Sequence, residues 1–434
     1  MKGIYDVTVY GAVGDGAASN TAAFEAAIQE ADAQGGGVIF VPPGQYVTGP
    51  IVLRSNMTLY ISRGAVILGS QDETEYPYMV LEGYVRNDRR SLITAVRAQN
   101  IAVEGGGVID ARGKMWWDKY EGDSRRPRTF QPILCDNVTI RDVTIRNSPM
   151  WTVHPLCCQN VTVDHVTIQN PPHSPNTDGI NPESCQNVHI SNCHIDVGDD
   201  CITLKAGQET EPMIKSRACE NITVTNCTML HGHGGVVIGS EMSGGVHNVV
   251  ISNCVFLGTE RGIRIKTRRR RGGSVTDVLV NNIMMKDVYA PLTMNGFYRW
   301  GILPGEEDLL DESPKPVDDK TPVMENIRVS NILSLRTKLA AIYIIGLPEQ
   351  PIRGLNINNF TVEMKNPERI QDIAVSIINR PLCCLNGVNI ENTEDVRIEG
   401  LTVKGQEGPA YVFKNCRNLV MDGRKIDEQE EIIE

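Results

Sequence analysis

The sequence has few aromatic residues and no long apolar segment. Only 5% of its 434 residues are Phe, Trp or Tyr, although 41% are hydrophobic. No apolar run approaches the roughly 20 residues of a membrane-spanning helix, so we expect no membrane span. The chain begins MKGIYD, without the apolar core of a secretion signal. We therefore expect a cytoplasmic protein, with a secreted protein whose signal has been removed as the alternative.

An excess of positive charge is also missing. The chain has 42 Lys and Arg against 53 Asp and Glu, a formal net charge of −11. Nucleic-acid binding needs a basic surface that neutralises phosphates. Nucleic acid is therefore not an expected partner, and the sequence leaves the oligomeric state open.

A repeated phrase organises the chain. Strong copies such as NVTIRDV and NVHISNC alternate apolar and polar residues, which predicts a strand. Successive copies are mostly about 23 to 29 residues apart, and loops lengthen some intervals. A repeated strand of this length predicts a parallel β-helix, an all-β solenoid whose coils bury their apolar faces by stacking. The copies begin at Asn137, Asn160, Asn187, Asn221, Asn248, Asp277, Asn326, Gly354 and Asp395.

The twelve cysteines follow the same repeat. Seven occupy two repeated positions, one of which is filled by Val, Ile, Leu or Phe in other copies. We interpret them as buried side chains, because no paired CxxC spacing indicates zinc. No metal or cofactor is expected. The seven are Cys135, Cys158, Cys185, Cys219, Cys193, Cys227 and Cys254.

We expect one domain over residues 1–434, with an N-terminal cap over residues 1–40. In that cap, Asn20 is predicted to cap a helix that ends at Gly35. Two irregular insertions are expected, at about residues 71–129 and 303–322.

Alignment of the copies brings charged residues into register. Asp178 aligns with Asp200 on the next coil, and Asp199 aligns with His233. Three crowded carboxylates raise the pKa of one of them, which suits the acid and base of glycoside hydrolysis. Calcium binding by these carboxylates is the alternative. Between the inward apolar residues, the alignment predicts an exposed row of Thr203, Lys205, Val237, Gly239, Arg264 and Lys266.

The basic residues of that row indicate an acidic ligand. Arg264 and Lys266 are suited to hold a substrate carboxylate. Lys205 and the run from Arg268 to Arg271 are further candidates for a positive groove, with a solvated loop as the alternative for the run.

Four motifs, NTDG at Asn176, GDD at Gly198, GHG at Gly232 and RIK at Arg264, resemble the signature motifs of the polygalacturonases, glycoside hydrolase family 28. The resemblance implies a right-handed parallel β-helix and hydrolysis of galacturonosyl linkages with inversion.

The resemblance also implies roles for individual residues. Asp199 is the general acid, Asp178 and Asp200 activate the water, and His233 supports the acid. Arg264 and Lys266 bind galacturonate. Because adjacent strand residues point in opposite directions, the use of both Asp199 and Asp200 predicts a bend at Gly198.

Further substrate contacts are expected from Asn176, Lys205, Glu241 and Tyr298. Tyr289 is the alternative to Tyr298. Trp151 and His154 are weaker candidates, and Trp151 aligns with the inward Ile180, which favours a core position equally.

The subtype is predicted from Asp200 and from the insertions. Rhamnogalacturonan hydrolases of the family tend to have Glu where Asp200 stands, so a galacturonan substrate is expected. Insertions that close one end of a groove favour exo action. The alternatives are a rhamnogalacturonan or xylogalacturonan galacturonohydrolase, a calcium-dependent pectate lyase and a non-catalytic sugar-binding solenoid.

Overall fold

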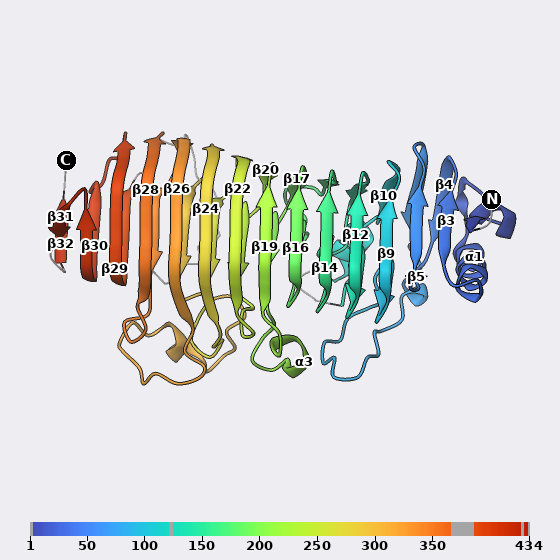
Figure 1. Ribbon diagram of the computed structural model, residues 1–434, viewed down its shortest axis with the longest axis horizontal. Helices are drawn as coiled ribbons and strands as arrows, with labels where there is room; N and C mark the ends of the chain where they lie inside the picture. Colours follow the sequence, from blue (N-terminus) through green and yellow to red (C-terminus); the bar gives the residue numbers. More distant parts are fainter. Residues whose placement is uncertain (1–2, 121–124, 366–385, 427–428, 433–434) are drawn as a thin grey trace. The chain divides into compact units, whose positions relative to one another are not determined.

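Parallel strands follow one another along nearly the whole chain. The computed structural model describes residues 3–120, 125–365, 386–426 and 429–432. The chain divides into two units, residues 1–203 and 204–434, and each is a stack of coils built from parallel strands (Figure 1). The predicted parallel β-helix is thus confirmed in each unit, while the single domain stays a prediction.

The strands of the first unit are short. They are β1 (Ile4–Asp6), β2 (Asp15–Ser19), β3 (Gly37–Val41), β4 (Gly44–Thr48), β5 (Ile51–Leu53), β6 (Met57–Ile61), β7 (Ala65–Gly69), β8 (Ile93–Val96), β9 (Gln99–Glu104), β10 (Val108–Asp110), β11 (Phe130–Ile133), β12 (Asp136–Arg141), β13 (Thr144–Arg146), β14 (Gln159–Asp164), β15 (Thr167–Gln169), β16 (Gln186–Ser191) and β17 (His194–Val197). The next strand in the sequence is β18 (Ile202–Leu204).

The strands of the second unit include longer ones. They are β19 (Cys219–Thr225), β20 (Thr228–His231), β21 (Val236–Gly239), β22 (Val246–Leu257), β23 (Arg261–Lys266), β24 (Ser274–Lys286), β25 (Ala290–Asn295), β26 (Val323–Thr337), β27 (Ala340–Ile345), β28 (Ile352–Met364), β29 (Asn386–Lys404), β30 (Tyr411–Met421), β31 (Arg424–Ile426) and β32 (Gln429–Ile432). The last two pair antiparallel with β30.

Left-handed corners explain the repeated phrase. Its first residue has a φ between 51° and 64° in all nine copies. The residue five positions later has a φ between 49° and 62°. Asn, Asp and Gly tolerate this conformation best. The corner amides also form ladders between coils, as where Asn137 Nδ2 donates to Asn100 Oδ1 at 2.9 Å.

The interior consists of aliphatic and cysteine side chains in register. Val138 of β12 pairs with Val161 of β14, and Val161 pairs with Val188 of β16. The ten cysteines in the described part of the chain are free thiols and buried. Their interpretation as core residues is therefore confirmed for those ten.

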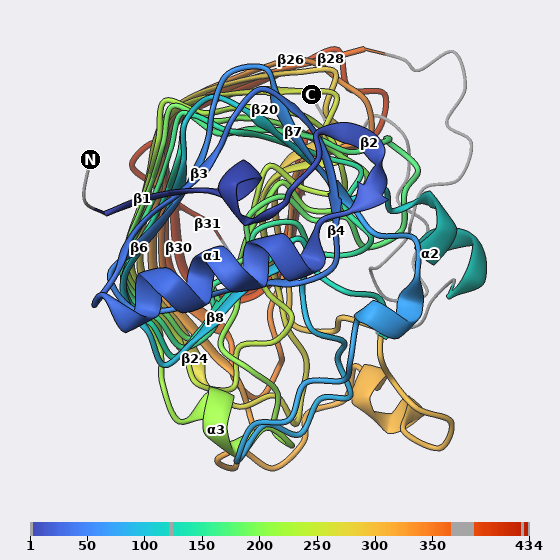
Figure 2. The same ribbon diagram turned by 90° about the vertical axis from the view of Figure 1, so that its right-hand side faces the viewer.

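The predicted N-terminal helix is α1 (Thr21–Ala33), which lies across the first coils of its unit (Figure 2). The predicted side-chain cap is wrong in its hydrogen bonds. Asn20 Oδ1 accepts from Val13 N at 2.6 Å, and Nδ2 donates to Val47 O at 3.2 Å. The amide therefore ties the preceding loop to β4 instead of closing the first turn. Strands β1 to β3 already belong to the coils, so the cap is smaller than residues 1–40.

The first insertion is shorter than predicted. Strands β8 to β10 form a regular coil within residues 71–129. This coil was missed because Gly106 stands six residues after Asn100, where the nine recognised copies have an apolar residue. The remainder includes η2 (Glu73–Glu75) and α2 (Lys114–Lys119). Residues 303–322 include η3 (Glu307–Leu310) and no strand, as predicted. The remaining short helices are η1 (Val7–Tyr10) and α3 (Pro212–Lys215), and no described helix is long and apolar enough to cross a membrane.

Candidate active site

Three carboxylates converge in the first unit. Gly179 N donates to Asp200 O at 3.0 Å, and Ile180 pairs with Ile202. This register places Asp178 beside Asp200, as predicted. One carboxylate oxygen from each of Asp178, Asp199 and Asp200 lies within 4.8 Å of the others.

A bend brings adjacent residues into this cluster. Strand β17 ends at Val197, and the chain bends at Gly198 and Asp199. A Cβ atom at Gly198 would lie 2.4 Å from Ser174 O, so the position requires glycine. The predicted bend is confirmed, and it lets Asp199 and Asp200 approach the same cluster.

Amide donors surround the carboxylates. Asp200 N donates to Asp199 Oδ1 at 2.8 Å, and Asn176 Nδ2 lies 3.4 Å from Asp199 Oδ2. Asn181 Nδ2 donates to Asp178 Oδ2 at 3.0 Å. Burial raises the pKa of the neighbouring Cys201 thiol well above its usual value, and the charges of the nearby aspartates raise it further.

Trp151 lies beside this cluster rather than in the core. Val153, and not Trp151, is the register partner of Ile180, so Trp151 is level with Asp178. Its half-buried ring has Arg128 at 4.9 Å and Arg86 at 5.9 Å from the centroid. The expected alignment was two residues off, and the correction places an aromatic face next to the acids.

His154 is not a substrate contact, because it is fully buried. Its Nε2 lies 2.9 Å from Glu183 Oε2, and its Nδ1 lies 3.1 Å from Gln131 Nε2. Gln131 donates through its amide, since its Oε1 accepts from Ser91. The imidazole therefore has its proton on Nε2 and is neutral. Burial lowers the pKa of His154 to about 4.

Glu183 anchors the first insertion. Arg86 makes a bidentate pair with it at 2.6 and 2.7 Å. Burial alone would raise the pKa of Glu183, but Arg86 and His154 hold it well below its usual range. This bidentate pair between half-buried Arg86 and fully buried Glu183 fixes the insertion to the coils next to Trp151.

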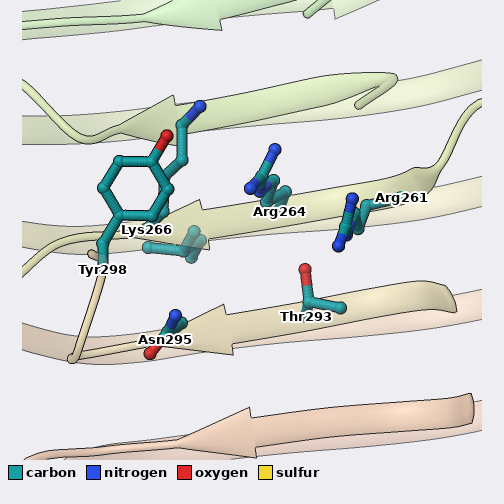
Figure 3. Close-up of a pocket in the computed structure, with 7 residues that line it drawn as sticks. Arg261, Arg264, Lys266, Thr293, Asn295 and Tyr298 are labelled. Atoms are coloured by element: carbon teal, nitrogen blue, oxygen red, sulfur yellow. The ribbon is translucent and has the colours of Figure 1, made fainter. Parts of the chain in front are cut away.

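Cationic side chains gather around a small pocket in the second unit (Figure 3). Arg264 pairs with Val237, and Lys266 pairs with Gly239, as the alignment predicted. Their side chains share a face of β23, because they are two residues apart. The Tyr298 ring lies 5.8 Å from the Arg264 guanidinium carbon and 5.2 Å from Lys266 Nζ. The pocket is lined by Arg261, Arg264, Ile265, Lys266, Thr293, Asn295 and Tyr298.

Two expectations about this region change. Tyr298 lines the pocket, whereas Tyr289 lies against Lys338, 5.4 Å from its ring. The outer row was expected to be exposed, but Arg264 is only 6% and Lys266 only 7% exposed. These cations are therefore poorly solvated, and the attraction between them and an anion is stronger than in water.

The remaining candidates of the second unit have protein partners. Arg264 Nη1 donates to the backbone oxygen of His233 at 3.4 Å. Lys205 Nζ lies 2.8 Å from Glu241 Oε2. Burial alone would raise the pKa of Glu241, but Lys205 and Arg271 hold it well below its usual range.

The run from Arg268 to Arg271 is neither a positive groove nor a solvated loop. Arg268 donates to the backbone of Trp300 and Gly301, and Arg269 pairs bidentately with Glu349 at 2.6 and 2.9 Å. Arg269 also donates to backbone oxygens of the second insertion. Three of the four side chains are buried, so the run fastens loops to the coils.

Sequence reasoning missed Asn181, Thr293, Asn295 and Arg126. Thr293 pairs with Arg264 and Asn295 pairs with Lys266 on the next coil. The alignment of outward residues stopped at the copy that begins at Asn248, and applying it to the next copy, at Asp277, would have found both. Asn181 follows Ile180, which pairs with Ile202, so the alignment would also have placed Asn181 in the row of Thr203. Arg126 gave no such signal, because it lies in the first insertion.

A β-helix with clustered carboxylates and a separate cation pocket defines a class of enzymes that act on acidic polysaccharides. Residues 78–384 match the glycosyl hydrolases family 28, and residues 4–65 match the family of rhamnogalacturonase A/epimerase, pectate lyase-like proteins. The chain belongs to glycoside hydrolase family 28 and is a glycoside hydrolase.

Known relatives agree with this assignment. A probable polygalacturonase of Vitis vinifera is 34% identical over 82% of this chain and 73% of its own. An exo-poly-α-D-galacturonosidase of Dickeya chrysanthemi is 29% identical over 66% of this chain and 55% of its own. The exopolygalacturonase of Thermotoga maritima superposes with a TM-score of 0.75, at 26% identity over 100% of this chain and 96% of its own.

Proposed function

We propose that this chain is a polygalacturonase, which hydrolyses α-1,4-galacturonosyl linkages in polygalacturonate or oligogalacturonides. The observation that carries the proposal is the pairing of two chemistries in one chain. One unit gathers Asp178, Asp199 and Asp200 within 4.8 Å, and the other gathers Arg264, Lys266 and Tyr298 around a pocket. Hydrolysis needs the first set, and a uronic acid substrate needs the second.

In the proposed reaction, Asp199 donates a proton to the glycosidic oxygen as the bond to the anomeric carbon breaks. Asp178 and Asp200 take a proton from the attacking water, and His233 supports Asp199. Arg264 and Lys266 hold the carboxylate of a galacturonate unit, and Tyr298 packs beside it. Asn176, Lys205 and Glu241 are proposed further contacts.

Inversion of the anomeric configuration is part of the proposal. Inverting enzymes usually separate their two carboxyl groups by about 6.5–9.5 Å, and retaining enzymes by about 5–5.5 Å. Here one oxygen from each aspartate lies within 4.8 Å of the others, which is closer to the retaining spacing, so the proposal of inversion rests on the resemblance to the signature motifs of the family and not on this distance. Proton NMR of the first product formed tests this directly, because a β-anomer from an α-linkage means inversion and an α-anomer overturns it.

Exo action is the finer part of the proposal. The Arg86–Glu183 pair holds an insertion beside Trp151, which is level with Asp178. A fixed insertion there favours cleavage near a chain end, and two relatives are named as exo-acting enzymes.

The test is product analysis on polygalacturonate over time. Monomer as the first and only small product supports exo action, and a ladder of shrinking oligomers overturns it. Rhamnogalacturonan and xylogalacturonan run in parallel test the other linkages. An unsaturated, ultraviolet-absorbing product that disappears with a calcium chelator would instead identify a lyase.

A further inference from the structure

Arg126 is a buried cation close to the carboxylate cluster but not part of it. Its side chain is 0% exposed. Its Nη1 donates to Pro149 O at 3.1 Å and to Pro175 O at 2.6 Å, and its Nη2 donates to Asn176 Oδ1 at 2.6 Å. The guanidinium thus holds the turn that leads into Asp178.

These contacts determine how the Asn176 amide is oriented. A guanidinium only donates hydrogen bonds, so the Asn176 atom that faces it is the oxygen. The amide nitrogen therefore faces the other way, toward Asp199 Oδ2 at 3.4 Å. Asn176 also has a φ of 54°, so its left-handed backbone fixes where the side chain starts.

We propose that Arg126 is a positioning residue for the reaction: it acts through Asn176, whose amide N–H it directs at the carboxylate of Asp199. The inference rests on the proposed role of Asp199 as the general acid. Within this unit, Asp199 faces the charges of Asp178 and Asp200, which favour its protonated form. The Asn176 and Asp200 N–H groups favour its ionised form. Arg126 maintains this balance without touching substrate.

The test is the pH profile of kcat/KM on polygalacturonate for Arg126→Gln. The acid must be protonated, so activity falls at high pH as Asp199 ionises. Without a directed amide donor, the ionised form is less stabilised, and the high-pH limb moves up by about half to one pH unit. Asn176→Gly removes the donor and tolerates the left-handed backbone. We expect the same shift from it.

The double variant separates the proposed route from a general effect. If Arg126 acts through Asn176, Arg126→Gln adds no further shift to Asn176→Gly. Arg89→Gln is the matched control, because Arg89 holds Glu73 O and Tyr76 O in the same insertion. We expect Arg89→Gln to lower the melting temperature and to leave the high-pH limb of the kcat/KM profile unchanged.

Three results would overturn the inference. An Arg126→Gln enzyme that is slower at every pH with an unmoved limb means a structural role alone, and additive shifts in the double variant mean a route that bypasses Asn176. An unmoved limb in Asn176→Gly contradicts the amide step even if Arg126→Gln does not fold. An active Asp199→Asn enzyme would instead contradict the proposed function itself.

Discussion

The acidic and basic clusters are built in different ways. Asp178, Asp199 and Asp200 lie in turns, and their convergence depends on the bend at Gly198. Arg264 and Lys266 lie on the regular strand β23, and their common face follows from strand alternation. The acids are therefore sensitive to local backbone geometry, whereas the cations depend only on the register of the coils.

The largest expected effect tests the acidic side of this comparison. Asp199→Asn should lower kcat by about 10²–10⁴-fold, because an amide does not deliver a proton to the leaving oxygen. KM should change little, and the melting temperature should stay or rise as one of three crowded charges is removed. Initial-rate kinetics measure kcat and KM, and calorimetry measures the melting temperature. Asp196→Asn, on β17, is the control and should keep its activity.

For the cation pocket, the comparison predicts that substitutions weaken substrate binding and leave the chemical step largely unchanged. Arg264→Ala should lower kcat/KM by about 10²–10³-fold, mainly through KM, because a poorly solvated charge pair with the substrate is lost. Arg264→Lys should restore only part of it, since a bidentate fork becomes a point charge. Arg270→Gln, at an exposed site, should change neither constant. A fall in kcat alone for Arg264→Ala would contradict the division of roles.

The same contrast explains what could be predicted from the sequence. The coils, the cysteine ladders and the pairing of Asp178 with Asp200 follow from a repeat that is visible in the sequence. Its asparagines occupy the left-handed positions where the chain turns between strands, so the repeated phrase indicates where each strand begins and ends. The coil at β8 to β10 was missed where Gly106 replaces the apolar residue of the phrase.

The remainder depended on contacts between distant segments. Nothing in the spacing of Arg268–Arg271 distinguishes a basic groove from buried ion pairs, because their partners are distant in the sequence. Arg269 binds Ser313 and Glu349, and Arg271 binds Gln208 and Glu209. The burial of His154 depends likewise on Glu183 and Gln131. Hydrogen-bond and ion-pair partners that lie outside the repeat could not be predicted from the sequence.

A smaller effect is expected on the pH dependence of stability, from the buried His154 and Glu183 of the first unit. His154 has a pKa of about 4 in the fold against 6.5 when unperturbed. The unfolded chain therefore binds the proton first as the pH falls from 6.5 to 4, and the folded state loses about 3 kcal/mol over that window. Glu183, whose pKa is depressed, adds loss in the same direction at lower pH. Urea unfolding at several pH values should show a shallower decline for His154→Gln, and an unchanged decline would contradict the neutral assignment.

The smallest effect concerns the edge of the cation pocket. Thr293 is 4% exposed, and its Oγ1 has no hydrogen-bond partner within the described residues. It pairs in register with Arg264, so a bound carboxylate is the natural acceptor for its hydroxyl. Thr293→Val keeps the shape and should raise KM about 10-fold, the lower end of the value of one hydrogen bond to a charged group. Thr293→Ser should keep the wild-type KM. If the hydroxyl is only an unsatisfied buried group, Thr293→Val will instead stabilise the protein and leave KM unchanged, because removing an unpaired polar atom from a buried position is favourable. Thermal unfolding and initial rates on the same two variants decide between these outcomes, and with them whether the cation site extends onto the next coil.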